Sequence, residues 1–241
     1  MRLWVIAGTT EARMFCEMVQ AVKDVELYVT LLHEPLVRYP VPVVVRQVTS
    51  VREFDGCIDV EGVCVDLIAD FSHPHAIGIR RLLENVDEEK VIAYQRKEVV
   101  KRGDRLVGSY VEMAKWLKRM GVGNLLAFLG AKGGRELLRS MMVVGYRAKV
   151  YLRSIRKVEG TVHIPFVIDT FENVEDLVVS LRPDAVVFKD SGVEGGTMEK
   201  VSVCERYDVP YVALSMPKKF GKNVFFSVDE IVEFLLRRLI K

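Results

Sequence analysis

The sequence predicts a doubly wound α/β protein with two separate sheets. Short apolar runs alternate with longer amphipathic ones along the chain, which is typical of buried strands joined by helices. About four or five strand candidates fall in each half, and two sheets hold that number better than one very wide sheet. A charged stretch with a glycine, EVVKRGDR at 98–105, separates the halves. We therefore expect an N-terminal domain at 1–98 and a C-terminal domain at 99–241, with the option that the closing helix packs back on the first.

In the first half, each element is expected from its apolar period. The strands are short apolar runs bounded by polar or glycine-containing turns, as in parallel strands that are buried on both faces. The helices carry apolar residues three and four positions apart. Strands are expected at 3–7, 25–32, 40–47, 65–71 and 90–96, and helices from the first loop to about 22 and at 77–86.

The same pattern restarts in the second half, without a convincing sequence repeat. A helix at 109–121 ends at a glycine, and we expect its Met113, Trp116, Leu117 and Met120, which lie at helical spacing, in the core. Strands are expected at 124–130, 147–155, 184–189 and 209–214, and helices at 135–143, 174–182, 198–208 and 228–240.

The composition excludes some functional classes. The chain has 241 residues, of which 50% are hydrophobic and 28% charged, which is ample for a globular core. Its net charge is only +2, so there is no global electrostatic case for a nucleic-acid partner. Any attraction for an anionic ligand must be local.

The cysteines and the apolar runs bear on location. None of the four cysteines forms a CxxC pair or has zinc-ligand spacing, and Cys16 lies in an apolar helical pattern typical of a core residue. The N-terminus lacks the pattern of a signal peptide, and no apolar run reaches about 18 residues. We expect a cytoplasmic protein with reduced thiols, no membrane association and no bound metal.

The first strand is followed by the loop GTTEAR. In an open parallel sheet, ligands bind beyond the carboxyl ends of the strands. Gly8 lets the backbone approach a ligand, Thr9 and Thr10 offer hydroxyls, and the following helix N-terminus favours a phosphate. Arg13 can pair with that phosphate. The alternative is an ordinary turn that Thr10 caps, without a ligand.

The loops after two further strands are also candidates. After the second strand, Glu34 lies where an acidic residue often binds a ribose hydroxyl, and Arg38 suits a 2′-phosphate, so the choice of coenzyme stays open. After 65–71 comes SHPHA, in which Ser72 can cap the next helix and Pro74 suits its first turn. His73 is either part of a ligand pocket or a hydrogen-bonded structural residue. No metal site is expected, because His73 and His75 have no third ligand clustered with them.

Two glycine-rich segments follow strands in the second half. AKGGRE, with Gly133 and Gly134, resembles an anion-binding turn. KDSGVEGGT begins with Lys189, a lysine that ends a buried apolar strand beside a glycine loop. Such a lysine is less often structural than a surface lysine, so we expect it to be functional.

Five motifs, taken in order, resemble one family. GTTEAR, SHPHA, YLRSI, KDSGVEGGTMEK and VPYVALSMP resemble the motifs of precorrin-6A reductase and its cobalt-precorrin-6A counterpart. The first is similar to the family's GGTxEAR-type opening, the second to its THPFA and KDSG to its KNSGG. Thr197 and Lys200 match a threonine and a lysine that follow. The resemblance spans nearly the whole chain, and the order and spacing together are fairly specific.

The resemblance implies a fold and an activity. The fold would be two Rossmann-like three-layer domains with mostly parallel sheets and a cleft between them. The activity would be reduction of one carbon–carbon double bond of a corrinoid precursor in cobalamin biosynthesis, giving precorrin-6B or its cobalt form. A hydride would pass from NADPH or NADH to a ring carbon, and a proton to its neighbour. The coenzyme, the presence of cobalt and the oligomeric state stay open.

Given this activity, we assign hypothetical roles to particular residues. Lys189 would be catalytic, as a cation that polarises the conjugated ring while the hydride arrives. The coenzyme contacts would be Gly8, Thr9, Thr10, Glu11, Arg13, Ser72, His73, Pro74, Ser191 and Gly192. The carboxylates of the substrate would meet a local basic cleft near the domain junction, drawn from Arg96, Lys97, Arg153, Arg156 and Lys157, and the substrate contacts would be Arg96, Arg153, Lys189, Asp190 and Thr197.

Several departures from the family pattern keep two other hypotheses open. Ala7 stands for a glycine, His75 for an aromatic residue and Asp190 for an asparagine, while Val193 and Glu194 are extra. The first alternative is a non-catalytic paralogue of the same fold that binds a tetrapyrrole or a nucleotide. The second is another nucleotide-dependent enzyme, such as a transferase, because a fold does not fix the chemistry.

Overall fold

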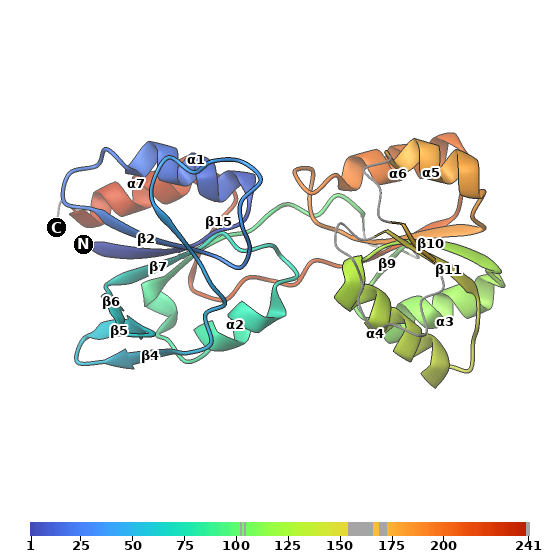
Figure 1. Cartoon of the computed structure of the whole chain (residues 1–241), viewed down its shortest axis with the longest axis horizontal. Coiled ribbons are helices and arrows are strands. Elements are labelled where there is room, and N and C mark those ends of the chain that lie inside the picture. Colours follow the sequence, from blue (N-terminus) through green and yellow to red (C-terminus); the bar gives the residue numbers. More distant parts are fainter. Residues whose placement is uncertain (102, 104, 154–165, 169–172, 240–241) are drawn as a thin grey trace. The chain divides into compact units, whose positions relative to one another are not determined.

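The protein consists of two compact α/β units (Figure 1). The computed structural model describes residues 1–101, 103, 105–153, 166–168 and 173–239. Unit 1 comprises Met1–Lys97 and Pro217–Lys241, and unit 2 comprises Glu98–Met216. The first boundary lies one residue from the expected one. The expected range 99–241 differs at its end, because the last segment of the chain packs in unit 1, as in the alternative given for the closing helix.

Unit 1 is built on a six-stranded sheet whose strands all run parallel. The order across the sheet is β15-β8-β7-β1-β2-β3. The strands are β1 (Arg2–Ile6), β2 (Glu26–Leu31), β3 (Val43–Val45), β7 (Leu67–Asp70), β8 (Val91–Tyr94) and β15 (Asn223–Phe225), and the helices are α1 (Thr10–Val19), α2 (Ile77–Leu83) and α7 (Val228–Leu239), with a 3₁₀ turn at Glu88–Lys90.

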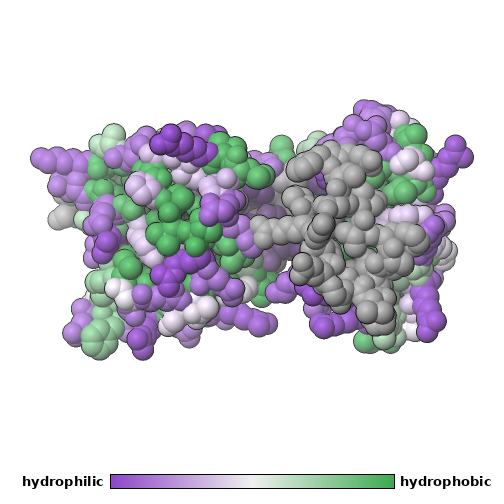
Figure 2. All heavy atoms as spheres, viewed as in Figure 1, coloured by the Kyte–Doolittle hydropathy of each residue, from purple (hydrophilic) through white to green (hydrophobic). Residues whose placement is uncertain are grey.

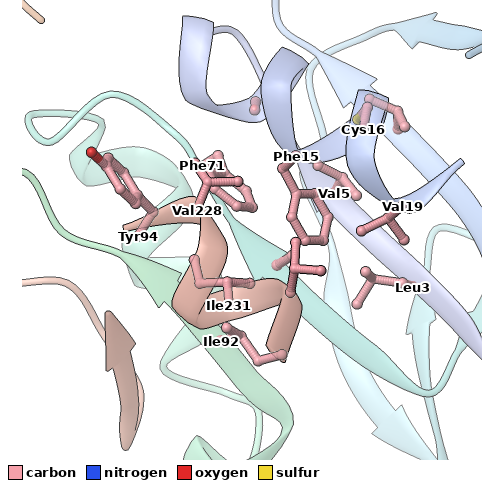
Figure 3. Close-up of a cluster of buried hydrophobic side chains, with 14 of the residues drawn as sticks. Leu3, Val5, Phe15, Cys16, Val19, Phe71, Ile92, Tyr94, Val228 and Ile231 are labelled. Carbon is pink, nitrogen blue, oxygen red and sulfur yellow. The ribbon is translucent and has the colours of Figure 1, made fainter. Parts of the chain in front are cut away.

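The two faces of this sheet carry separate cores, as the alternation of side chains along a strand requires. Leu3 and Val5 of β1 face a cluster that includes α1 and α7, and Figure 3 shows Phe15, Val228 and Ile231 meeting there. The neighbouring β1 residues Trp4 and Ile6 belong to a second cluster, with Leu83 of α2. The closing helix α7 therefore completes the core of unit 1.

A small antiparallel sheet, which the sequence analysis missed, belongs to the second of these clusters. It consists of β4 (Val51–Phe54), β5 (Cys57–Val60) and β6 (Val63–Val65). Its two-residue turns are Asp55-Gly56 and Glu61-Gly62, all four with positive φ, which is the geometry of type I′ hairpins. Asp-Gly between two strands is the sequence signal that could have found it.

Two cysteines of this small sheet are joined. Cys57 of β5 and Cys64 of β6 form a disulfide, so the expectation of reduced thiols is wrong for this pair. Cys16 and Cys204 are free and buried, and Cys16 is the core residue that its pattern predicted. In the described parts of the chain, no helix has the length and apolar character needed to cross a membrane. The cytoplasmic location stays a prediction.

Unit 2 has a second six-stranded parallel sheet, in the order β12-β11-β10-β13-β14-β9. Buried clusters form on both faces, one with α3 and α4 and the other with α5 and α6. The strands are β9 (Leu106–Val107), β10 (Asn124–Phe128), β11 (Lys149–Arg153), β12 (Phe166–Ile168), β13 (Ala185–Lys189) and β14 (Tyr211–Leu214), and the helices are α3 (Tyr110–Met120), α4 (Gly130–Val143), α5 (Val174–Leu181) and α6 (Thr197–Arg206).

The parallel α/β class and the main elements are confirmed, with local corrections. Met113, Trp116 and Leu117 are buried as expected, but Met120 is 50% exposed and lies outside the core. Helix α4 begins at Gly130 rather than at 135, so Gly133 and Gly134 are helical and do not form an anion-binding turn. A Cβ at Gly134 would lie 2.5 Å from a Leu152 methyl group, so this glycine allows α4 to pack closely on β11.

Candidate functional site

Both sheets have one position where the chain changes direction across the sheet. From β1 the chain runs outward through β2 and β3, and then returns to β7 on the other side of β1. In unit 2 it runs from β10 through β11 and β12, and then returns to β13 on the other side of β10. A crevice forms at the carboxyl ends of strands on either side of such a switch point. The loops after β1, β7, β10 and β13 lie at these points, and they contain many of the residues that the sequence singled out.

The loop after β1 approaches the helix N-terminus with its backbone exposed. Gly8 has φ of +115°, and a Cβ there would meet no atom within 4 Å, so the space above it is open. Thr9, not Thr10, caps α1, because its hydroxyl accepts from the N–H of Ala12 at 3.3 Å. The Thr9 hydroxyl also donates to the carbonyl of Phe71 at 3.0 Å, which ties this loop to the loop after β7. Thr10 is exposed at the start of the helix.

Tyr39, which the sequence analysis did not single out, pins the same loop. Its hydroxyl accepts from the N–H of Gly8 and donates to the carbonyl of Thr9, both at 3.2 Å. Burial raises the pKa of Tyr39, so the hydroxyl stays protonated and able to donate. The loop that carries Glu34 and Arg38 leads directly into Tyr39, and both of those side chains are exposed.

Exposed apolar side chains accompany that loop. Leu36 is 94% exposed, and Leu32 and Val37 are also exposed. Figure 2 shows hydrophobic side chains gathered on the visible face of unit 1. The loop after β2 therefore offers apolar surface beside its two charged candidates, without favouring either one for a ribose.

Glu11 and Arg96 form a buried ion pair with each other. Nε and Nη2 of the arginine lie 2.6 and 2.9 Å from the two carboxylate oxygens, and the side chains are only 5% and 7% exposed. Burial is the largest single effect and raises the pKa of Glu11. The hydrogen bonds from Arg96, the backbone and Thr9, together with the charge of Arg96, outweigh burial and lower this pKa overall. The two charges thus balance each other inside the protein. The expected contacts of Glu11 with the coenzyme and of Arg96 with the substrate stay predictions.

Arg13 lies on the same helix as Glu11, one turn of the chain beyond Thr9. Its Nη1 forms an ion pair with Glu17 at 2.9 Å, and the side chain is half-exposed. An exposed pair of this kind contributes little, so the guanidinium can turn to another anion at small cost. The expected phosphate contact of Arg13 stays a prediction.

The loop after β7 is held by a lysine from the far end of the chain. Lys219 donates to the Asp70 carboxylate and to both the carbonyl and the hydroxyl of Ser72. Ser72 therefore does not cap α2, whose N-cap is Ala76 without a side-chain bond. Pro74 is buried and precedes the helix. Neither Asp70 nor Lys219 was expected, and their separation of 149 residues hides the pair from sequence reasoning.

The two histidines of this loop lie near each other. Their ring centroids are 5.8 Å apart, and Nδ1 of the exposed His73 accepts from the N–H of His75 at 3.2 Å. Among the described residues, no group of three or more His, Cys, Asp or Glu side chains could hold a metal ion. His73 and His75 thus form the solvent side of the loop wall.

In unit 2, Lys189 ends β13 with a half-buried side chain. No described residue forms a hydrogen bond or ion pair with its ammonium group. A Cβ at Gly133 would lie 2.8 Å from Tyr110 Oη and 3.2 Å from Lys189 Cε, so these three residues converge at the carboxyl end of the sheet. Burial, with repulsion from Lys132, lowers the pKa of Lys189, while burial raises the pKa of Tyr110 to about 12.

The loop that follows Lys189 is organised from within. The wholly buried Asp190 accepts from the N–H groups of Val99 and Val100 at 2.8 and 2.9 Å, and from that of Gly192 at 3.0 Å. The buried Thr197 hydroxyl accepts from the N–H of Ser191. Asp190 and Thr197 therefore hold the loop in shape from within. Their expected contact with a substrate stays a prediction.

The remaining residues of this loop have different surroundings. Ser191 and Gly192 are buried, whereas Val193 and Glu194 are exposed in a turn. The two extra residues therefore extend into solvent and do not fill the crevice. The expected coenzyme contacts of Ser191 and Gly192 stay predictions.

Further cations surround the carboxyl edge of the same sheet. Lys200 donates to the carbonyls of Gly195 and Gly196, and burial lowers its pKa. Arg153 ends β11, where its guanidinium carbon lies 5.7 Å from the centroid of Phe128 and its buried Nε has no hydrogen-bond partner among the described residues. Of the other expected carboxylate ligands, Lys97 is exposed in unit 1, and Arg156 and Lys157 lie outside the described residues.

Two parallel α/β units, each with polar loops at its topological switch point, define a Rossmann-like protein. A model of the family described as precorrin-6x reductase CbiJ/CobK matches residues 2–236, so the chain belongs to that family. It is thus an oxidoreductase of cobalamin biosynthesis, as the motifs predicted.

A solved structure supports the fold. The chain is similar to one described as CobK precorrin-6A reductase, with a TM-score of 0.70 and 18% sequence identity over 98% of this chain and 96% of the other. No curated protein matches the sequence. The match confirms the expected fold class, and family membership disfavours the transferase hypothesis.

Proposed function

We propose that the protein reduces precorrin-6A or cobalt-precorrin-6A to the corresponding 6B form with NADPH or NADH. The observation that carries the coenzyme part is the neutralised first turn of α1. Glu11 is the acidic residue there, and its charge is balanced by Arg96 inside the protein. A phosphate at this helix N-terminus therefore meets N–H groups and the helix dipole without an uncompensated carboxylate.

The residues around this turn fit a dinucleotide. Gly8 leaves open space for a pyrophosphate to approach the backbone, and Thr10 offers an exposed hydroxyl. Arg13 would pair with a phosphate oxygen, and the loop 72–75 would form a wall of the site. When bound, the reduced nicotinamide supplies the hydride, and the protein orients it.

The charge at the carboxyl edge of the sheet in unit 2 suits an anionic macrocycle. Lys132, Lys189, Lys200 and Arg153 supply positive charge at this edge, although the chain as a whole is nearly neutral. The carboxylates of a corrinoid precursor would be bound by this charge. Lys189, whose ammonium lacks a protein partner among the described residues, would polarise the conjugated ring as the hydride arrives.

The first experiment is a titration of the purified protein with NADPH and NADH, followed by nicotinamide fluorescence, with ATP and S-adenosylmethionine as controls. We expect saturable binding of one reduced dinucleotide, and the ratio of the two dissociation constants identifies the coenzyme. The absence of binding at millimolar concentration, with the substrate present as well, would contradict the proposal and favour the non-catalytic paralogue.

Arg13 supplies the matched variant. Arg13→Glu places a carboxylate next to the proposed phosphates and should raise the dissociation constant about tenfold or more, since charged hydrogen bonds contribute about 1.5–3 kcal/mol. Arg139→Glu, at an exposed arginine of α4 in unit 2, is the control for the change in net charge. Equal affinity of Arg13→Glu and the wild type would remove Arg13 from the site.

A further inference from the structure

We propose that Lys219 is a positioning residue for the coenzyme site of unit 1. By binding both Asp70 and Ser72, Lys219 fixes the loop 71–76. The inference rests on the proposed function, because it presumes that this loop forms a wall of the coenzyme site. Lys219 itself would contact neither coenzyme nor substrate.

The geometry uses every donor of the lysine. Its Nζ lies 2.9 Å from the Asp70 carboxylate, 2.7 Å from the Ser72 carbonyl and 2.8 Å from the Ser72 hydroxyl. An ammonium group has three N–H donors, and all three have an acceptor. The side chain of Lys219 is 6% exposed and that of Asp70 is 2% exposed, so solvent does not compete for these bonds. The position of Ser72 is therefore tied to the end of β7 through a buried cation.

The main chain of Lys219 extends this support to a second strand. Its N–H donates to Oε1 of Gln95 at 2.8 Å, directly after β8. Gln95 precedes Arg96, whose guanidinium holds Glu11 in the first turn of α1. The loop 71–76 is also bound to the loop after β1, because the Thr9 hydroxyl donates to the Phe71 carbonyl. Two cations and two carboxylates thus underlie both loops of the proposed coenzyme site without a net charge.

Stability alone does not account for this arrangement. A buried ion pair must overcome the loss of hydration of both charges, and apolar residues of similar volume often stabilise a protein as well or better. Burial lowers the pKa of Lys219 while Asp70 opposes that shift, which is the sign of this cost. What the lysine adds, and an apolar residue cannot, is a fixed orientation for the Ser72 carbonyl and hydroxyl. Fixed polar groups at a ligand wall are what tight, oriented binding of a coenzyme needs.

The test separates loop positioning from stability with two variants. Lys219→Met leaves Asp70 buried without its cation, so it should lower both the unfolding temperature and the affinity for reduced dinucleotide. Asp70→Asn/Lys219→Met removes both charges and should recover most of the unfolding temperature. We expect its dissociation constant for NADPH or NADH to stay about tenfold or more above that of the wild type, since the Ser72 carbonyl and hydroxyl are no longer held. The asparagine at position 70 can still accept from the Ser72 N–H, as Asp70 Oδ1 does at 2.9 Å, so the variant tests the bonds of Lys219 alone. In the double variant, kcat at saturating coenzyme should return toward the wild-type value, whereas the KM for the coenzyme should stay raised.

Lys222→Met is the matched control, because Lys222 is exposed and pairs with Glu89 at the surface of the same segment. It should leave the unfolding temperature and the dissociation constant unchanged. A double variant that recovers both stability and affinity would overturn the proposal and leave Lys219 with a structural role only. A wild-type protein that binds no reduced dinucleotide, with substrate present, would overturn the proposed function together with this inference.

Discussion

The most informative single residue is the lysine at the end of β13. Lys189 is half-buried, its pKa is lowered by burial and by Lys132, and no described residue binds its ammonium. A protein selected for stability alone would replace or pair such a group, because an unpaired buried charge is costly. The sequence indicated its importance correctly, since a lysine at the end of an apolar strand is unusual.

Lys189→Met should therefore change stability and activity in opposite directions. We expect turnover of the corrinoid substrate to fall by a factor of about 100–1,000, the loss seen when one electrostatic stabiliser is removed. Coenzyme affinity should stay the same. The variant should also be more stable than the wild type by about 0.5–2 kcal/mol at neutral pH, in the range typical of such replacements.

The pH dependence of this stability difference has a definite sign. The pKa of Lys189 is lower in the folded than in the unfolded protein, so the unfolded state binds more protons between the two values. The wild type gains stability as the pH rises through that window, and the variant does not. The advantage of Lys189→Met should be complete below the pKa that Lys189 has in the folded protein, and it should vanish as the pH rises toward the unfolded-state value of about 10.4. Chemical unfolding at several pH values measures it, and an advantage that grows with pH would contradict the lowered pKa.

Other residues of the site could not be predicted because their partners are distant in sequence. Tyr39 lies about 30 residues from the glycine it binds, and Lys219 lies 149 residues from Asp70. Sequence motifs identify only the loops that face the ligand, whereas Tyr39 and Lys219 hold those loops in place through hydrogen bonds. The same reasoning applies to the ion pair of Glu11 and Arg96, because the two residues are 85 positions apart and only the fold reveals that they pair.

At the scale of elements, the sequence predicted what is long and strongly apolar. The strands β1, β7, β10 and β13 are nearly continuous apolar runs, and each was expected. The strands of the two large sheets that were missed, β9, β12 and β15, have only two or three residues, too few to establish a period. They occupy sheet edges, where pairing with a neighbouring strand rather than local composition decides the structure.

Two helical glycines provide a test of packing between elements. Gly134→Ala would place a Cβ 2.5 Å from a methyl group of the buried Leu152, and the repacking should cost about 1–3 kcal/mol of unfolding free energy. Gly78→Ala in α2 meets no atom within 4 Å and should instead stabilise the protein by about 0.5–1 kcal/mol. Denaturant titration of both variants measures the contrast. Stabilisation by Gly134→Ala would contradict the close approach of α4 and β11.

At the scale of the whole molecule, the two units differ in continuity, because one continuous segment forms unit 2 and two separate segments form unit 1. Every strand and helix of unit 2 lies within the continuous range Glu98–Met216. Unit 1 is discontinuous, because β15 and α7 come from the C-terminal end and pair with β8 and α1. Apolar periodicity finds the helix α7 but does not indicate which sheet it covers, which is why the second domain was expected to run to 241.

This inequality predicts how the pieces of the chain fold. Residues 98–216 contain their own complete sheet and both of their core clusters, so this fragment should fold cooperatively by itself. Residues 1–97 should not, because Val228, Ile231, Val232 and Leu235 complete their first core, and each buried side chain of this kind contributes about 1.5–3 kcal/mol. Circular dichroism and thermal unfolding of the two fragments test this, with the full chain as the reference.

Adding the peptide 217–241 to residues 1–97 should restore a cooperative transition, since it supplies both β15 and α7. Cooperative unfolding of residues 1–97 alone at the stability of the full chain would show that the C-terminal segment is not part of this core.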